Sequence, residues 1–215
     1  MTGVYFIDEK TGWVTGVKGV LLSTDDGGLR WTRAKGDSHI TMNAVLFTSP
    51  DQGFIAGHEG KLLFTENGGQ NWVLRETGTK VDLLQLFFIN PKVGWVSGAA
   101  GTILKTTDAG LTWFSLKSGT NSLLTDVSFV DEKTGWAVGA GGTVLYTTDG
   151  GETWMQQTTG TLQFLTSVHF ANQKIGWVTG TKQTILYTER AGEAPPETER
   201  DLTNASMPTQ EKPVD

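Results

Sequence analysis

The sequence predicts an all-β fold, a β-propeller built from five repeats of 41 residues. Two markers keep the same register along the chain. One is a tryptophan that closes a Thr-x-Asp-Gly-Gly-like turn, at Trp31, Trp72, Trp113 and Trp154. The other is a glycine-aromatic pair that begins at Gly12, Gly53, Gly94, Gly135 and Gly176. A period in the forties is typical of one supersecondary unit stacked several times. The 28 glycines and eight tryptophans favour strands and turns over helices.

Each repeat contains four short segments that read as antiparallel strands A to D. Strand A ends in a phenylalanine, at Phe6, Phe47, Phe88, Phe129 and Phe170. Strand B follows a polar turn and covers residues 12–16, 53–57, 94–98, 135–139 and 176–180. A glycine-rich turn leads to the alternating strand C, and the tryptophan turn leads to strand D. Four such strands in 41 residues match one propeller blade.

The repeats divide residues 1–190 into copies at 1–41, 42–82, 83–123, 124–164 and 165–190. The fifth copy loses the pattern after Thr188 and has no closing tryptophan, so we expect a blade without its outer strand. The blades then form a small ring, an open arc, or an oligomer of a larger propeller. A ring or a closed oligomer is favoured, because an open arc leaves two apolar blade faces bare. Residues 191–215 combine prolines with acidic and small polar residues, which predicts a disordered tail.

The tryptophan turn has a physical reason to recur. An aspartate or asparagine at its third position can accept N–H groups of its own turn, while the tryptophan folds back onto the blade. Because these columns repeat in every complete copy, we interpret them as structural and not as calcium-binding or catalytic residues. The set comprises Asp26, Trp31, Asn67, Trp72, Asp108, Trp113, Asp149 and Trp154.

Composition excludes several classes of function. The formal net charge is −6, and six acidic and two basic residues lie from residue 191 onward. The body therefore has 15 basic and 17 acidic residues, too near neutrality for a nucleic-acid face built on a basic field. Cysteine is absent, and His39, His58 and His169 fall in unrelated columns, so we expect no metal site and no cofactor. No apolar run is long enough for a membrane span, and we expect no signal peptide at the start of this chain, which leaves its localisation open.

The repeat resembles the Asp-box of sialidase-type propellers. With Gly-Trp-x-x-Gly in strand B and Val-x-Phe-x-Asp in strand A, residues 1–190 resemble the photosystem II stability/assembly factor family. That resemblance implies a seven-bladed, usually exported propeller without enzymatic activity, which binds a partner polypeptide as an assembly chaperone. This chain differs in having five repeats and an incomplete fifth one.

The columns that vary between repeats are the better place for a binding site. They lie in the B–C turns and the D–A connections, which share one face of a propeller. Several lysines there could form a mildly positive rim suited to an acidic peptide. The predicted partner-binding residues are Lys18, Lys35, His58, Glu59, Lys80, Lys117, Asp126 and Lys182.

Two other functions stay open. The chain could be a propeller fragment or engineered repeat protein without autonomous activity. It could also be a carbohydrate-binding propeller or a glycoside hydrolase, with Asp82 and Asp126 as a carboxylate pair near the axis. A sialidase is disfavoured, because Arg30, Arg33 and Arg75 lie in or beside the outermost strand and cannot converge there.

Overall fold

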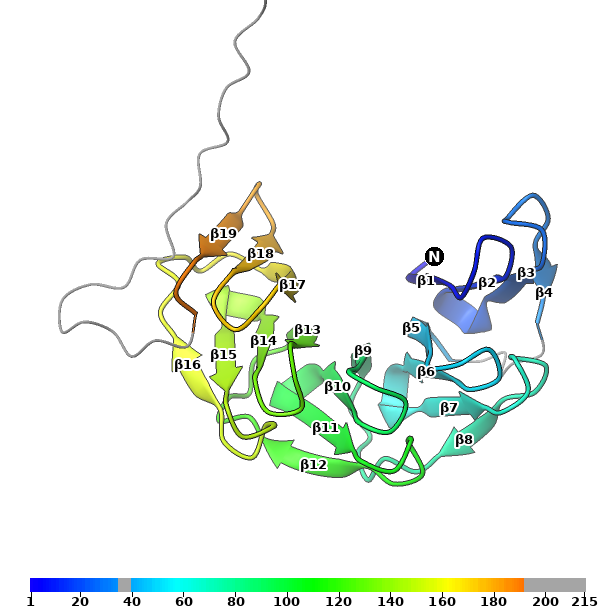
Figure 1. The fold of residues 1–215 in the computed structure, drawn as a ribbon, viewed down its shortest axis with the longest axis horizontal. Coiled ribbons are helices and arrows are strands. Elements are labelled where there is room, and N and C mark those ends of the chain that lie inside the picture. The colour runs from blue at the N-terminus through cyan, green and yellow to red at the C-terminus, as the bar shows by residue number, and fades with distance from the viewer. Residues whose placement is uncertain (35–39, 192–215) are drawn as a thin grey trace, which may run out of the picture.

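The computed structural model describes residues 1–34 and 40–191 as five antiparallel sheets, each of which is one blade (Figure 1). Within these ranges four sheets have four strands and the last sheet has three. The predicted propeller of five repeats, with a fifth blade that lacks its outer strand, is therefore confirmed. The predicted tail at residues 191–215 lies outside the described residues, except for Ala191.

Blades 1 to 4 contain strands A to D in chain order, and blade 5 contains strands A to C. The strands are β1 (Gly3–Phe6), β2 (Gly12–Thr15), β3 (Leu21–Thr24) and β4 (Thr32–Arg33); β5 (Met42–Phe47), β6 (Gly53–Gly57), β7 (Leu62–Thr65) and β8 (Val73–Arg75); β9 (Leu83–Phe88), β10 (Gly94–Gly98), β11 (Thr102–Thr106) and β12 (Phe114–Lys117); β13 (Leu124–Phe129), β14 (Gly135–Gly139), β15 (Val144–Thr147) and β16 (Met155–Gln157); and β17 (Leu165–Phe170), β18 (Gly176–Gly180) and β19 (Ile185–Thr188). Single 3₁₀ turns join B to C at Val17–Gly19, His58–Gly60, Ala99–Gly101 and Ala140–Gly142.

The blades form an open arc (Figure 1). The A strands line its concave side, and the D strands β8, β12 and β16 form its convex edge. Blade 1 and blade 5 lie at opposite ends, so a single chain does not form the ring that the sequence favoured. Within the described ranges, no helix has the length and hydropathy that a membrane crossing requires.

The hydrophobic core lies between the blades. There are four clusters of buried side chains in the described chain, and each fills the boundary between two neighbouring blades. The aromatic residue of strand B stacks on the strand-A phenylalanine of the next blade in every case. The ring-centroid distances are 3.8 Å for Trp13–Phe47, 4.8 Å for Phe54–Phe88, 3.6 Å for Trp95–Phe129 and 3.5 Å for Trp136–Phe170. The aromatic residue of the glycine-aromatic marker is thus one half of a repeated contact, and the strand-A phenylalanine of the next blade is the other half.

A β-bulge near the start of strand A adds a polar link between blades. In blades 2 and 4 the A–B register shifts around Asn43 and Thr125. The bulged side chains donate to the next strand A: Asn43 Nδ2 to the Leu83 carbonyl (2.7 Å) and Thr125 Oγ1 to the Leu165 carbonyl (2.8 Å). A bulge re-aims a side chain in this way, here toward the neighbouring blade.

The tryptophan turns are held by their own hydrogen bonds. In blade 4 the Thr147 hydroxyl donates to Asp149 Oδ1 (2.8 Å), and the Thr153 N–H donates to the same oxygen (2.9 Å). Asn67 accepts the equivalent bonds from Thr65 and Asn71 in blade 2. Since an amide oxygen serves as well as a carboxylate, the position needs an acceptor and not a charge.

Candidate functional site

One face of the arc is built from the B–C turns and the D–A connections, and we call it the loop face. Backbone hydrogen bonds join the two kinds of segment: Gly19 N to Ile40 O (2.7 Å), Gly101 N to Ser122 O (2.8 Å) and Gly142 N to Gln163 O (2.9 Å). The loop face comprises residues 17–19, 58–60, 99–101, 140–142 and 181–184, with connections 40–41, 76–82, 118–123 and 159–164 and the adjoining end of β12 at Lys117, which pairs with Thr102. The opposite face carries the A–B turns and the tryptophan turns, and we call it the turn face.

The tips of the B–C turns have the same backbone but different side chains. The tip residue lies in the left-handed region in all five blades, with φ of 54° at Lys18, 57° at Glu59, 53° at Ala100, 67° at Gly141 and 53° at Lys182. Glycine adopts this conformation most readily, and a side chain there is strained. Three of the five tips nevertheless carry a long charged side chain on the exposed surface.

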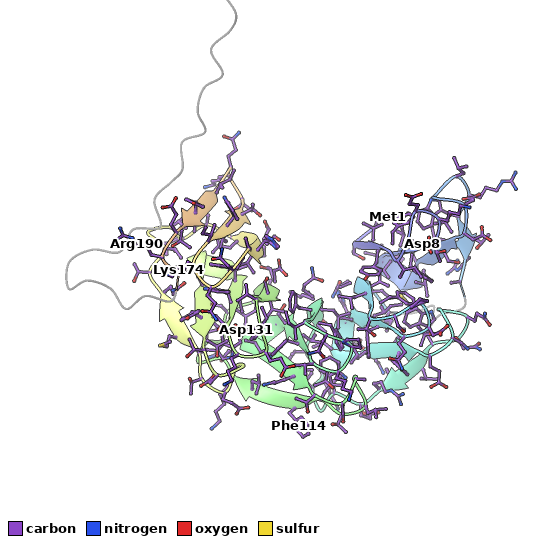
Figure 2. The ribbon with its side chains drawn as sticks, viewed as in Figure 1. Met1, Asp8, Phe114, Asp131, Lys174 and Arg190 are labelled. Atoms are coloured by element: carbon purple, nitrogen blue, oxygen red, sulfur yellow. The ribbon has the colours of Figure 1, made fainter. Side chains whose placement is uncertain are left out.

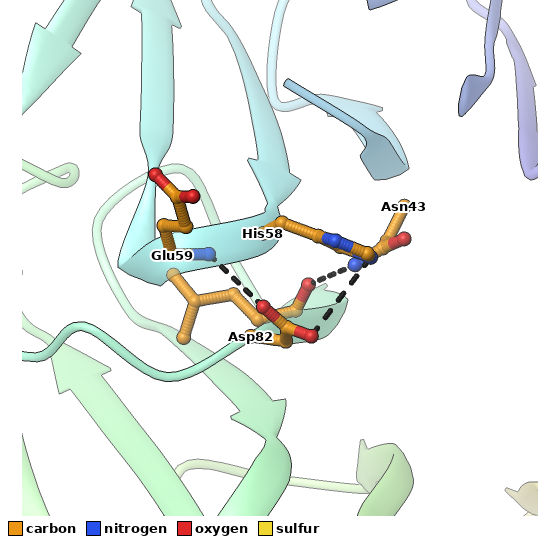
Figure 3. Close-up of polar contacts among 5 residues, drawn as sticks. Asn43, His58, Glu59 and Asp82 are labelled. Carbon is orange, nitrogen blue, oxygen red and sulfur yellow. Dashed lines mark hydrogen bonds and ion pairs between the residues drawn. The ribbon is translucent and has the colours of Figure 1, made fainter. Parts of the chain in front are cut away.

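A polar cluster lies where blades 2 and 3 meet on the loop face (Figure 3). Asp82 accepts a hydrogen bond from the Glu59 backbone N–H at 3.0 Å, and its other oxygen lies 3.9 Å from His58 Nε2. Both side chains of this ion pair are more than 40% exposed, so the pair adds at most about 1 kcal/mol of stability. The bridging bond from Asn43 to Leu83 lies beside them. The structure therefore brings predicted residues His58 and Glu59 together, and it adds Asp82 to them.

The predicted lysines do not form one compact rim. Lys80 and Lys117 are exposed near the middle of the arc, at the 2–3 connection and at the end of β12. Lys18 and Lys182 are also exposed, but they lie in blades 1 and 5, at opposite ends (Figure 1). Lys35 lies outside the described residues.

Asp126 is not on the surface where the sequence placed it. Its side chain is buried between blades 4 and 5, with 8% of its area exposed. Its Oδ1 accepts from Val127 N (2.8 Å), and its Oδ2 accepts from Ser167 Oγ (2.8 Å) and Val168 N (2.9 Å). Burial raises the pKa of Asp126, although these hydrogen bonds act to lower it. This carboxylate links two blades and has no free oxygen for a partner or for a glycosidic bond.

Sequence reasoning overlooked apolar side chains on the loop face. Leu162 and Phe164, in the 4–5 connection, are 85% and 37% exposed, and Val17 is 52% exposed. The repeat itself holds a signal for them, because Leu162 shares its column with Lys80 and Asn121. An apolar residue where the other repeats carry polar ones marks a surface that differs from its copies.

The turn face is more regular. Each tryptophan turn donates a backbone N–H to the A–B turn of its blade, as from Gly27 to Lys10 O (2.9 Å) and from Gly150 to Lys133 O (2.7 Å). The A–B turns are closed by a side-chain acceptor, which is Ser49 in blade 2 and an aspartate or asparagine in the other blades. Asp131, for example, accepts from Lys133 N (2.8 Å) and Thr134 N (2.7 Å). Figure 2 shows Asp131 among the side chains of blade 4. In residues 1–34 and 40–191, no group of three histidine, aspartate or glutamate side chains could hold a metal ion.

Comparison with solved structures supports the fold. The structure titled "YCF48 bound to D1 peptide" has a TM-score of 0.70 and 23% sequence identity, covering 86% of this chain and 62% of that one. YCF48 from Cyanidioschyzon merolae has a TM-score of 0.70 and 20% identity, covering 89% and 67%. A GH74 enzyme from Niastella koreensis has a TM-score of 0.71 and 16% identity, covering 87% and 36%. This chain thus spans about three fifths of the first of these, and at such identities the similarity shows the fold alone.

Sequence comparison gives the family. No curated protein matches the sequence significantly. Residues 1–80 and 112–208 match the family described as "Photosynthesis system II assembly factor YCF48". These two segments cover most of the 215 residues, and they carry four of the five members of each aromatic column of the blade contacts. The chain therefore belongs to the photosynthesis system II assembly factor YCF48 family.

Proposed function

We propose that this chain is a non-enzymatic propeller that binds a polypeptide segment on its loop face, as an assembly factor does. One relative in the family was solved bound to a D1 peptide, which makes a segment of D1 the first partner to test. The observation that carries the proposal is the contrast between the faces. The turn face repeats its side chains from blade to blade, whereas the loop face varies them on a constant backbone.

The left-handed tips support recognition at the loop face. Strain of this kind is retained where a side chain serves a purpose that glycine cannot serve. Gly141 shows that glycine fits the turn, and nothing lies within 4 Å of the position that its Cβ would take. Lys18, Glu59 and Lys182 therefore project from strained tips without packing that would explain them.

The loop face also has the chemistry that a peptide needs. Lys80 and Lys117 offer positive charge near the middle of the arc, Asp82 and Glu59 offer acceptors, and Leu162 offers apolar area. Exposed backbone turns complete the surface. A polypeptide presents negative charge, hydrogen-bond donors and apolar side chains at short intervals along its length, unlike a small ligand in a closed pocket.

Glycoside hydrolysis fits the geometry less well. It requires two carboxyl groups that flank a bound sugar and reach its glycosidic oxygen or a water. Asp126 is buried, and both its oxygens accept hydrogen bonds from blades 4 and 5. Asp82 is exposed but lies against His58 and the Glu59 backbone. These two residues, the only pair that the sequence suggested, do not form such a site.

The test measures binding of fluorescent synthetic peptides that tile the D1 sequence, by anisotropy. The double variant Lys80→Glu/Lys117→Glu changes the loop face, and Lys92→Glu/Lys133→Glu makes the same change of charge on the turn face. We expect at least one peptide to bind, with affinity about tenfold weaker for the loop-face variant and within about twofold of wild type for the control. Equal losses in both variants, or no binding by any D1 peptide, would contradict the proposal.

A further inference from the structure

The two ends of the arc expose opposite halves of the blade contact that recurs inside it. At the blade-5 end, Trp177 is 41% exposed, whereas Trp13, Trp95 and Trp136 in the same column are at most 3% exposed. At the blade-1 end, Phe6 is 40% exposed, whereas Phe47, Phe129 and Phe170 are at most 6% exposed. One end thus presents the strand-B aromatic, and the other presents the strand-A phenylalanine that receives it.

The surroundings of these residues show the same contrast. Val4 in blade 1 is 64% exposed, but Val45 in its column is 6% exposed. Ile185 in blade 5 is 38% exposed, but Ile103 in its column is fully buried. Both ends therefore present several apolar side chains that are covered at the internal boundaries of the described chain.

Blade 1 also keeps the shape that receives an indole ring. At the boundary between blades 1 and 2, Trp13 Nε1 of blade 1 lies 2.6 Å from the position that a Cβ on Gly69 of blade 2 would take. At Gly28, the same position in blade 1, the nearest side chain is Trp31 of the same blade. Phe6 and Trp31 form a T-shaped pair with ring centroids 5.9 Å apart, just as Phe47 and Trp72 do at 5.8 Å. A hollow of about 460 Å³ lies between Val4, Val14, Leu22 and Trp31 on this face.

We propose that the chain self-associates head to tail, with Trp177 of one copy stacked on Phe6 of the next. A second copy is the occupant because it carries both halves of the contact in the register that the chain already uses at four internal boundaries. The interface is heterologous, since two different surfaces meet, and it continues the blade stack from one copy into the next. Figure 2 shows Met1 at the blade-1 end and Arg190 at the blade-5 end, across the opening of the arc.

Sedimentation velocity of the full chain, between about 1 µM and about 100 µM, tests this association. The wild type should form species larger than a monomer as concentration rises. Phe6→Ala and Trp177→Ala should each weaken association by about 30-fold or more, as loss of a central aromatic does at an interface. The control Phe114→Ala removes a side chain that is 59% exposed on the convex edge and should leave association unchanged (Figure 2).

Mixing the two variants gives the decisive result. The Phe6→Ala chain keeps a native Trp177 end, and the Trp177→Ala chain keeps a native Phe6 end. One copy of each variant can therefore form one native contact with the other. We expect a heterodimer that does not grow further, detected by giving one variant a mass tag, with circular dichroism to show that both variants are folded. A wild type that stays monomeric to about 100 µM, or folded variants that stay monomeric when mixed, would overturn the proposal.

Discussion

The strand-B tryptophans allow one residue type to be tested in two environments of the same chain. Trp95 lies in Gly94–Gly98, is fully buried and stacks on Phe129 at 3.6 Å. Its Nε1 also donates to the Gly150 carbonyl at 3.1 Å. Trp177 lies in the matching strand at the end of the arc, and its ring contacts Tyr187 of its own blade in a tilted arrangement, with 5.3 Å between ring centroids.

Trp95→Ala should lower the free energy of unfolding by about 3–5 kcal/mol. A buried indole covers roughly 150–250 Å², worth about 4–6 kcal/mol as an upper bound, and the Gly150 carbonyl also loses its donor. Trp177→Ala should cost less, about 2–3 kcal/mol, because the side chain is already 41% exposed and correspondingly less area is lost. Urea unfolding followed by circular dichroism, at a concentration where both chains are monomeric, measures the two losses. Equal losses would refute the conclusion that stacking between blades stabilises the arc.

Three further predictions concern single side chains. Asp126→Asn should destabilise the chain by about 1–3 kcal/mol in urea, because the amide NH₂ would face N–H or O–H donors, and it should leave peptide affinity unchanged. Burial raises the pKa of Asp149, but the hydrogen bonds from Thr153, Thr147 and Gly151 together outweigh burial and lower the pKa to about 2, below the unfolded value of about 3.9. The stability that ionised Asp149 contributes is therefore present above about pH 4 and lost as pH falls toward 2. Solvent exposure limits that contribution to about 1 kcal/mol. Asp149→Asn should remove this part of the pH dependence of the urea midpoint. Ala100→Gly should raise the free energy of unfolding by up to about 1 kcal/mol, and Gly141→Ala should lower it by a similar amount. Thermal midpoints measure both changes, and shifts of the opposite sign would contradict left-handed strain at these tips.

The repeated part of the fold could be predicted because each blade boundary buries the same pair of residues. Trp95 and Phe129 belong to different repeats, but each recurs every 41 residues, so their columns are visible without a structure. The acceptor role of Asp149 could be predicted in the same way, because Asn67 replaces it in blade 2 without loss of the turn.

Features that depend on several blades at once could not be predicted. The shape of the arc follows from the rotation between successive blades, which no local pattern gives. Asp126 is polar and close to a connection, which suggested a surface site, but the bulge at Thr125 lets it reach Ser167 in the next blade. Leu162 departs from its column, but the sequence does not show that this exposed leucine lies on the same face as the B–C turns.

The most direct test of the account is hydrogen exchange, by mass spectrometry, of the chain with and without the D1 peptide that binds it most tightly. We predict slower exchange at the middle of the loop face, in residues 58–60, 80–82, 99–101 and 120–123. The A–B turns at 90–93 and 131–134, on the turn face, should exchange at the same rate in both samples. Protection confined to those A–B turns or to the convex strands β8 and β12, with none at the loop face, would contradict peptide recognition by the loop face.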